Sequence, residues 1–318
     1  MLSRVANSIY WMSRYLERVE NYSRFVSVNI NLSYDLPDTI SRQWTLLLEA
    51  AHDKEMYQSL YGENEDQNKI IDFITFDRLN PNSILNMLAN ARENARTVKE
   101  TLPKEVWEHL NGFYLDFNKS KKPQIENLLP FYEKIKQKCQ LFNGMMDGTL
   151  SRNEAHYFAN LGKFIERADK TSRFLDIGYF NFSAVSDEKQ VNPQDLLIWS
   201  SVLKSVSAFN MYRQKYKSLR QDNIIEFLIK DRDFPRAIHH SIKKAEYALY
   251  RLSGARPQDS YTNPAEKSMT LLKNLIDFTE TQEIIDQGLH NFLNEFQIKN
   301  NNIDSEIFKV YFDLEAKF

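Results

Sequence analysis

The chain has 318 residues, with 41 basic and 43 acidic side chains and a formal net charge of −2 at pH 7. This near balance excludes the strongly basic surface typical of nucleic-acid-binding proteins and indicates no attraction to an acidic membrane. The single cysteine, Cys139, excludes an internal disulfide and a cysteine-rich metal site.

Scarce glycine and proline, at 8 and 9 residues, indicate long helices. We expect an all-α fold of about ten to twelve helices, because no segment alternates in the way typical of a useful strand. In chain order, apolar residues at helical spacing and the placement of proline predict helices over roughly 2–33, 39–61, 70–76, 81–100, 103–117, 124–147, 151–182, 193–216, 235–252, 265–296 and 304–314.

The N-terminal stretch MLSRVANSIYWMSRYLERVE contains no apolar run long enough for a signal peptide. No other stretch approaches the roughly 20 apolar residues that a membrane-spanning helix needs. We therefore expect a cytoplasmic protein that binds neither membrane nor nucleic acid.

One charged stretch occurs twice. YLERVENYSRF at 15–25 and FIERADKTSRF at 164–174 share Glu, Arg, Ser, Arg and Phe at the same positions. Two further blocks recur in the same order and at nearly the same separation. The spacing of Trp44, Tyr57 and Tyr61 returns in Trp199, Tyr212 and Tyr216, and FITFDRLNP at 73–81 aligns with FLIKDRDFP at 227–235.

These ordered blocks predict an internal duplication of a unit of about 150 residues. We expect two similar multi-helix bundles, at 1–150 and 151–318, fused into one compact unit. Chance similarity among amphipathic helices is the alternative, and the ends of the two halves match poorly.

The opening MLSRVANSIYWMSRYLERVENYSR and the stretch LGKFIERADKTSRFLD at 161–176 resemble the alpha-E family of bacterial all-helical proteins. Members of that family tend to be encoded beside circularly permuted ATP-grasp proteins and transglutaminase-like proteins. The resemblance implies a component of an amide-bond-forming or peptide-modifying system, acting as partner or accessory enzyme of an ATP-grasp ligase. Its expected partners are an ATP-grasp-type protein, a transglutaminase-like protein and a peptide ligand. The alternative is a structural helical interaction protein with no chemistry of its own.

The repeated stretch carries the candidate site. On a helical projection its charges form one stripe beside aromatic residues. The stripe comprises Arg14, Glu17, Arg18 and Asn21 in the first copy and Lys163, Glu166, Arg167 and Lys170 in the second. The face expected to meet water contains Ser3, Ser13, Glu20, Ser27 and Asn31. A partly buried carboxylate needs a cation nearby, so the stripe is interpreted as an ion-pair network that fixes helix register. A polar cleft for a carboxylate, a phosphate or a peptide is the competing interpretation, and a plain solvated surface is the third. The candidate residues are Arg14, Glu17, Arg18, Asn21, Arg24, Glu166, Arg167 and Arg173.

Two pairing schemes remain open for these charges. Glu166 can pair locally with Arg167, and Glu17 with Arg14 or Arg18. Alternatively the two copies meet, and Glu17 pairs with Arg167 and Glu166 with Arg18. No residue type or spacing assigns a catalytic group, so the sequence does not decide whether the protein is an enzyme.

Other motifs are weaker. Glu49 and His52 have the Glu-x-x-His spacing of di-iron bundles, but the second copy lacks it, so we expect no metal site. Neither a Walker-type loop nor a GxGxxG motif is present, so we expect no nucleotide site and no cofactor.

Four further expectations concern packing. Asp77–Arg78 and Asp231–Arg232 are expected to cap helices and tie loops, Cys139 to be an inert thiol, and His239–His240 to lie on the surface. The four tryptophans, Trp11, Trp44, Trp107 and Trp199, are expected to pack in the core or between helices.

Overall fold

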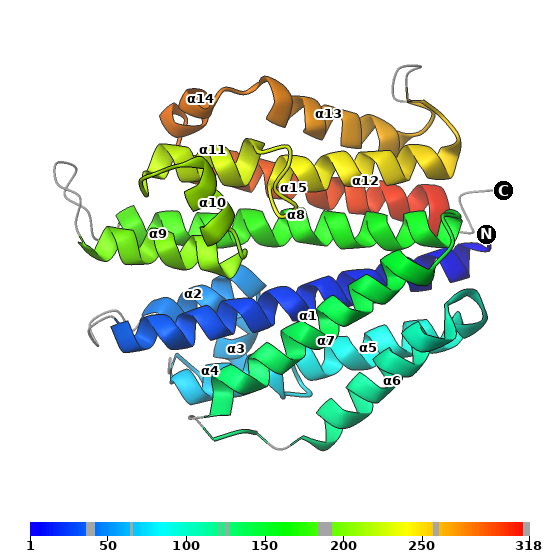
Figure 1. The fold of residues 1–318 in the computed structure, drawn as a ribbon, viewed down its shortest axis with the longest axis horizontal. Helices are drawn as coiled ribbons and strands as arrows, with labels where there is room; N and C mark the ends of the chain where they lie inside the picture. The colour runs from blue at the N-terminus through cyan, green and yellow to red at the C-terminus, as the bar shows by residue number, and fades with distance from the viewer. Residues whose placement is uncertain are drawn as a thin grey trace. The chain divides into compact units, whose positions relative to one another are not determined.

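The computed structural model describes residues 1–35, 42–63, 66–120, 122–124, 127–183, 193–256 and 261–313 (Figure 1). These residues form 15 α-helices, a 3₁₀-helix at Lys99–Thr101 and a π-helix at Phe308–Phe312, without any strand. The all-α prediction is therefore confirmed, with more helices than the ten to twelve expected. In the described ranges no helix has both the length and the apolar character needed to cross a membrane.

The chain divides into two compact units, which are described separately. The inner unit comprises Tyr15–Leu150, and the terminal unit comprises Met1–Arg14 together with Ser151–Phe318. The long helix α1 (Ser3–Asp35) contributes to both. Residues 1–14 thus group with 151–318 rather than with the rest of the first half.

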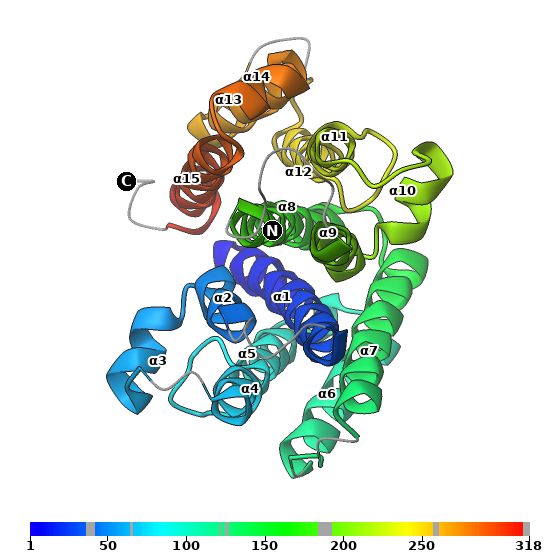
Figure 2. The ribbon, with the colours of Figure 1, turned by 90° about the vertical axis from the view of Figure 1, so that its left-hand side faces the viewer.

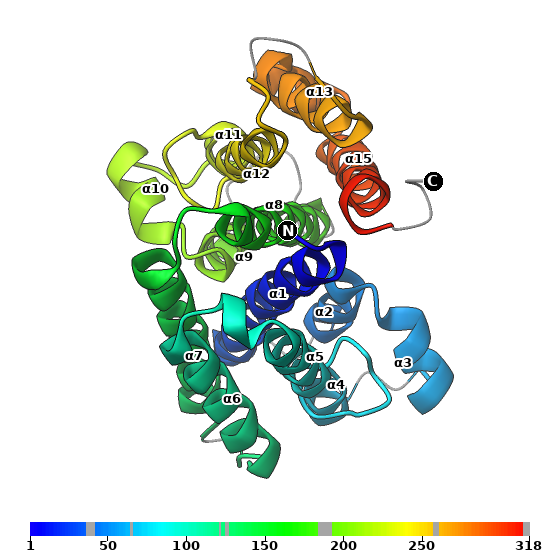
Figure 3. The ribbon, with the colours of Figure 1, turned by 90° about the vertical axis from the view of Figure 1, so that its right-hand side faces the viewer.

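The inner unit contains most of α1 and six further helices. Its α5 packs against α4 and α6, and α6 packs against α7, as Figure 3 shows. The bounds are α2 Arg42–Ala51, α3 Lys54–Tyr61, α4 Gln67–Thr75, α5 Ile84–Thr97, α6 Lys104–Lys119 and α7 Leu128–Thr149.

The terminal unit is built around α8. This helix packs along α12, α15 and α9, and α13 lies against α15 and α12 (Figure 2). The bounds are α8 Glu154–Ser183, α9 Pro193–Ser205, α10 Phe209–Lys215, α11 Gln221–Lys230, α12 Ile238–Ser253, α13 Pro264–Phe278, α14 Thr281–Asp286 and α15 Leu289–Ile307.

Most of the extra helices arise because three predicted helices are interrupted, and α11 (Gln221–Lys230) lies where no helix was predicted. The helix expected over 39–61 breaks at His52, which has a φ of 60°, and the one over 193–216 breaks at Ser207, with a φ of 55°. Left-handed backbone at a helix end is usually supplied by glycine, so neither break carries the usual sequence signal. The third break, in the helix expected over 265–296, separates α13, α14 and α15, and Gly288 precedes α15 with a φ of 90°.

A glycine brings the start of α1 close to α8 within the terminal unit. A Cβ atom added at Gly162 would lie 2.4 Å from the Tyr10 carbonyl oxygen and 3.2 Å from Cγ of Arg14. Only glycine permits this approach of helix to backbone. The contact places the Arg14 side chain over the charged face of α8.

Candidate functional site

Four charged side chains of α8 are buried in the terminal unit. Glu166, Asp169, Lys170 and Arg173 are exposed by 0%, 4%, 4% and 6%. Their spacing of three and four residues puts them on one helix face. Buried charges require partners, and this face supplies both signs.

Arg14 joins this face to α15. Its Nε and Nη2 atoms each lie 2.9 Å from Oε2 of Glu166, and its Nη1 lies 2.6 Å from Oδ1 of Asp304. Burial by itself lowers the pKa of Arg14, but Tyr10, Asp304 and Glu166 outweigh it and hold that pKa well above its ordinary value. Arg14 is therefore a fixed cation between two carboxylates.

At the other end of the network, two cations share one carboxylate. Asp169 accepts hydrogen bonds from Nε and Nη2 of Arg173 at 2.8 and 2.9 Å, and Nζ of Lys170 lies 3.0 Å away. Burial raises the pKa of Asp169, yet the two cations overcome this and hold it well below its usual range. Lys170 also approaches Glu166 at 3.6 Å, which connects the two ends.

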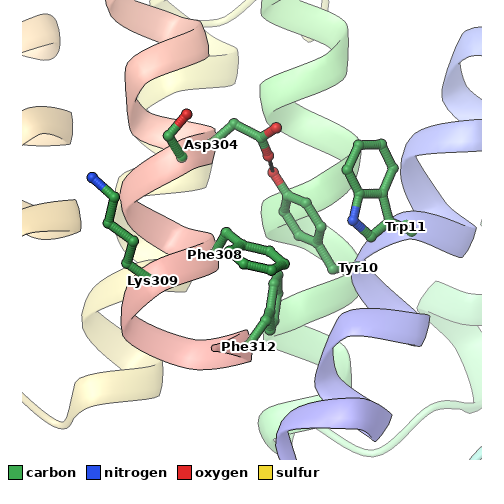
Figure 4. Close-up of a pocket in the computed structure, with 7 residues that line it drawn as sticks. Tyr10, Trp11, Asp304, Phe308, Lys309 and Phe312 are labelled. Carbon is green, nitrogen blue, oxygen red and sulfur yellow. Dashed lines mark hydrogen bonds between the residues drawn. The ribbon is translucent and has the colours of Figure 1, made fainter. Parts of the chain in front are cut away.

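A pocket of about 300 Å³ opens beside the Arg14 end of the network. Figure 4 shows the ring of Tyr10 between Trp11 and the two phenylalanines, with its hydroxyl donating to Asp304. Burial raises the pKa of Tyr10 well above its ordinary value, so the hydroxyl remains a donor. The lining residues are Tyr10, Trp11, Asp304, Ser305, Phe308, Lys309 and Phe312.

One wall of the pocket is a π-helix. Phe308–Phe312 follows α15 directly and supplies Phe308, Lys309 and Phe312. π-Helices are rare and occur frequently at functional sites. The sequence predicted a helix over 304–314 but not this pocket. The available signal was the spacing of Asp304, Phe308 and Phe312, which places an acid and two rings on one side of a helix.

The predicted site residues of the inner unit have partners of their own. Glu17, which is 1% exposed, accepts a hydrogen bond from Nδ2 of Asn21 at 3.0 Å. Arg18 donates to Oδ1 of Asn82 at 3.1 Å, and Arg24 pairs with Glu20 at 2.5 Å. In the terminal unit, Arg167 donates to the Pro235 carbonyl at 3.5 Å.

The structure thus brings Arg14, Glu166 and Arg173 into one network with Lys170, which lies on the predicted stripe. Asp169 and Asp304 also belong to it, and neither was named as a candidate. Glu17 and Arg18 belong to one unit, and Glu166 and Arg167 to the other. Pairing between these copies stays a prediction.

The expectation that this face of α1 meets water is wrong for Ser13, Glu20 and Ser27, whereas Asn31 is exposed and Ser3 is partly exposed. Ser13, Glu20 and Ser27 are exposed by only 6%, 1% and 7%. The helix tolerates their burial because Arg24 neutralises Glu20 and the Ser27 hydroxyl donates to the Ser23 carbonyl at 2.8 Å.

The repeated Asp-Arg pairs tie their loops as expected, but they do not cap the helices that follow, whose N-cap residues are Ser83 and Ala237. Asp77 and Asp231 each accept a hydrogen bond from the backbone two residues ahead, at 2.8 and 2.9 Å. Cys139 is buried, as expected. Glu49 pairs with Lys54, and the described part of the chain holds no group of three side chains suited to a metal ion.

His239 is not on the surface, contrary to expectation. It is 3% exposed, and its Nε2 lies 2.7 Å from Oδ1 of Asp277. Burial lowers the pKa of His239, which favours the neutral ring.

Two of the tryptophans, Trp44 and Trp199, are buried as expected, whereas Trp11 lines the pocket.

Comparison with known proteins agrees with the two Glu-Arg motifs. The family model Alpha-E, described as a predicted alpha-helical domain with a conserved ER motif, matches residues 1–312. Searches of curated proteins and of solved structures find no match. Because the family model covers nearly the whole chain, this protein belongs to the Alpha-E family.

Proposed function

We propose that this protein is a binding component of an amide-bond-forming or peptide-modifying system, acting as partner or accessory protein of an ATP-grasp-type ligase. The family resemblance supports this system, with a transglutaminase-like protein as a further partner. The observation that carries a binding role is the pocket lined by Tyr10, Asp304 and the π-helix, which is a preformed place for a small chemical group. In this proposal the ligase supplies the nucleotide site and this chain holds the peptide.

The buried charges have a structural part in this proposal. Arg14 touches Glu166 on α8 and Asp304 on α15, so it ties the start of α1 to both helices. Removing one member of a buried ion pair costs about 3–5 kcal/mol. The network therefore favours a single register of these helices, and this register sets the position of Tyr10 and Asp304 in the pocket wall.

We also infer that the two units arose by duplication of one helical unit. Both contain the same left-handed break, in which Asp53 N donates to Leu48 O at 2.9 Å and Ala208 N to Leu203 O at 2.7 Å. These bonds form the same helix-ending motif at corresponding places. Chance similarity of amphipathic helices gives no reason for such agreement.

Aromatic packing supports the same inference. Tyr57, Tyr61 and Phe73 form a mutual cluster with ring centroids 5.2 to 6.0 Å apart. Their counterparts, Tyr212, Tyr216 and Phe227, form a second cluster with separations of 5.0 to 6.2 Å. The repeated sequence blocks therefore correspond to repeated local packing.

Co-expression with the products of neighbouring genes tests the proposed function. We expect the tagged protein to retain an ATP-grasp-type protein through purification, and mass analysis to find a bound peptide. Phe308→Leu should lower peptide recovery, because it removes one wall of the pocket while leaving Arg14 and Glu166 in place. Glu295→Gln is the matched control, since this half-exposed carboxylate pairs with Lys299 elsewhere on α15. Absence of any such partner in the purified complex would refute the proposal.

A further inference from the structure

We infer that the pocket of the terminal unit binds the ammonium group of a lysine side chain carried by a peptide. This inference rests on the proposed function and specifies which group the peptide presents. It follows from the rings, the charges and the exposure of the residues around the pocket.

Aromatic rings make up most of the wall. Tyr10, Trp11, Phe308 and Phe312 line the pocket, and the Tyr10 ring lies 5.4 Å from that of Phe312 and 5.9 Å from that of Trp11. Ring faces attract cations, and aromatic cages are a known way to hold ammonium groups. The same wall already holds one cation, because the Arg14 guanidinium lies 4.9 Å from the centre of the Trp11 ring.

Asp304 is the carboxylate of the network that lines the pocket. Arg14 is shared between two carboxylates, Glu166 and Asp304, whereas at the far end two cations share Asp169. Asp304 therefore shares its cationic partner with Glu166. An ammonium group in the pocket would give Asp304 a second cationic partner.

Asp304 is the carboxylate that a ligand can reach. Its side chain is 28% exposed, whereas that of Glu166 is 0% exposed. Tyr10 and Arg14 both use its Oδ1 atom, and the described residues show no hydrogen bond to Oδ2. Asp304 lines the pocket, and its Oδ2 atom can accept from an ammonium group that binds there.

The remaining charge at the rim does not favour an anion. The Lys309 side chain is 62% exposed, and its Nζ lies 3.0 Å from Oε1 of Glu306. The Arg14 side chain is only 7% exposed and already has two carboxylate partners. Both cations at the pocket are therefore already paired with carboxylates.

Binding of small probes to the isolated full-length chain tests the inference. The probes are Nα-acetyl-lysine amide, its uncharged analogue Nα-acetyl-norleucine amide, and Nα-acetyl-glutamate amide, titrated by calorimetry or by NMR. We expect the lysine probe to bind at least about tenfold more tightly than either of the others, because both the rings and Asp304 favour a cation.

Two variants locate the binding. Asp304→Asn keeps an acceptor for Tyr10 but removes the charge, and should weaken the lysine probe by about tenfold or more. Phe308→Leu should weaken it about threefold. Since Phe308 is 50% exposed and outside the ion pairs, this variant should remain folded even if Asp304→Asn does not. Glu295→Gln should leave binding unchanged.

The outcomes separate this inference from the proposed function. Equal binding of the lysine and norleucine probes, preferential binding of the glutamate probe, or an unchanged affinity in Phe308→Leu would overturn the inference. If the ligase co-purifies while the lysine probe fails to bind, only the ammonium assignment is wrong. If the lysine probe binds as expected while no ligase co-purifies, the assignment stands and the proposed system is wrong.

Discussion

The Glu-Arg motif has the same local ion pair in the two units, and in the terminal unit it connects to an ionic chain that reaches α15. In the inner unit Arg24 pairs with Glu20, and in the terminal unit Arg173 pairs with Asp169, both one helical turn apart. Glu17 accepts a hydrogen bond from the amide of Asn21, and Glu166 meets the cations Arg14 and Lys170.

The two copies of the motif share one structural contact, and the terminal unit has an ionic chain as well. In each unit the motif arginine reaches the loop at the repeated proline, through Asn82 for Arg18 and through the Pro235 carbonyl for Arg167. That contact is a shared structural role. The ionic chain that continues to Asp304 belongs to the terminal unit, and the pocket lies at its end.

The largest expected effect is on Glu166. Glu166→Gln leaves Arg14 and Lys170 facing a neutral amide in a buried site, and should lower the free energy of unfolding by about 3–5 kcal/mol. Denaturant titration of the variant and of Glu295→Gln measures this, and the control should change by less than about 0.5 kcal/mol. A loss below about 1 kcal/mol for Glu166→Gln would mean that the network is solvated.

The coupling free energy between Arg14 and Glu166 should be smaller than the loss expected for Glu166→Gln. In a double-mutant cycle, Arg14→Met and Glu166→Gln should couple by about 0.5–3 kcal/mol, because they touch directly. The measurement is denaturant unfolding of the single and double variants, with transitions of the two units analysed separately if they resolve. Additive losses would show that Arg14 and Glu166 act independently.

Acid should weaken the terminal unit through Asp169. Its folded-state pKa lies below the unfolded-state value of roughly 3.9, so its ionised form stabilises the fold above that pH and the contribution is lost as the pH falls further. Asp169→Asn lacks this contribution. Its free energy of unfolding, measured from pH 7 to 2, should therefore differ from wild type by a constant amount near neutral pH, and this difference should shrink as the pH falls below roughly 3.9. A difference that stays constant below that pH would contradict the assignment.

Because the motif arginines Arg18 and Arg167 have the same role, replacing either one should lower the free energy of unfolding by a similar amount. Arg18→Met and Arg167→Met each remove a charge-assisted contact to the proline loop from a half-buried side chain, and each should cost about 1–2 kcal/mol. Urea unfolding of both variants checks this expectation. A loss in only one unit would indicate that the two arginines have diverged.

The smallest expected effect concerns the two left-handed breaks. His52→Gly and Ser207→Gly should each stabilise the protein by about 0.5–1 kcal/mol, since glycine adopts a positive φ without the strain of a Cβ atom. Thermal unfolding can resolve the change. Destabilisation by both substitutions would mean that their side-chain contacts outweigh the backbone strain.

Several features of the fold followed from the sequence because they depend on local patterns. Apolar spacing predicted α1 and α8 to within a few residues, and the paired Asp-Arg blocks predicted the loops that Asp77 and Asp231 tie. The breaks at His52 and Ser207 were missed, because neither residue is glycine.

The site itself was predictable only in part. The sequence by itself determined that the stripe containing Arg14 and Glu166 needs partners, since a carboxylate beside aromatic residues cannot remain buried alone. Only the tertiary structure decided which partners those are. Arg14 meets Asp304 from the far end of the chain, Gly162 allows α1 to approach α8, and the π-helix turns Phe308 and Phe312 toward Tyr10. Helical periodicity depends on neighbours a few residues away, whereas these contacts depend on which helix faces pack together, and the local pattern does not encode that choice.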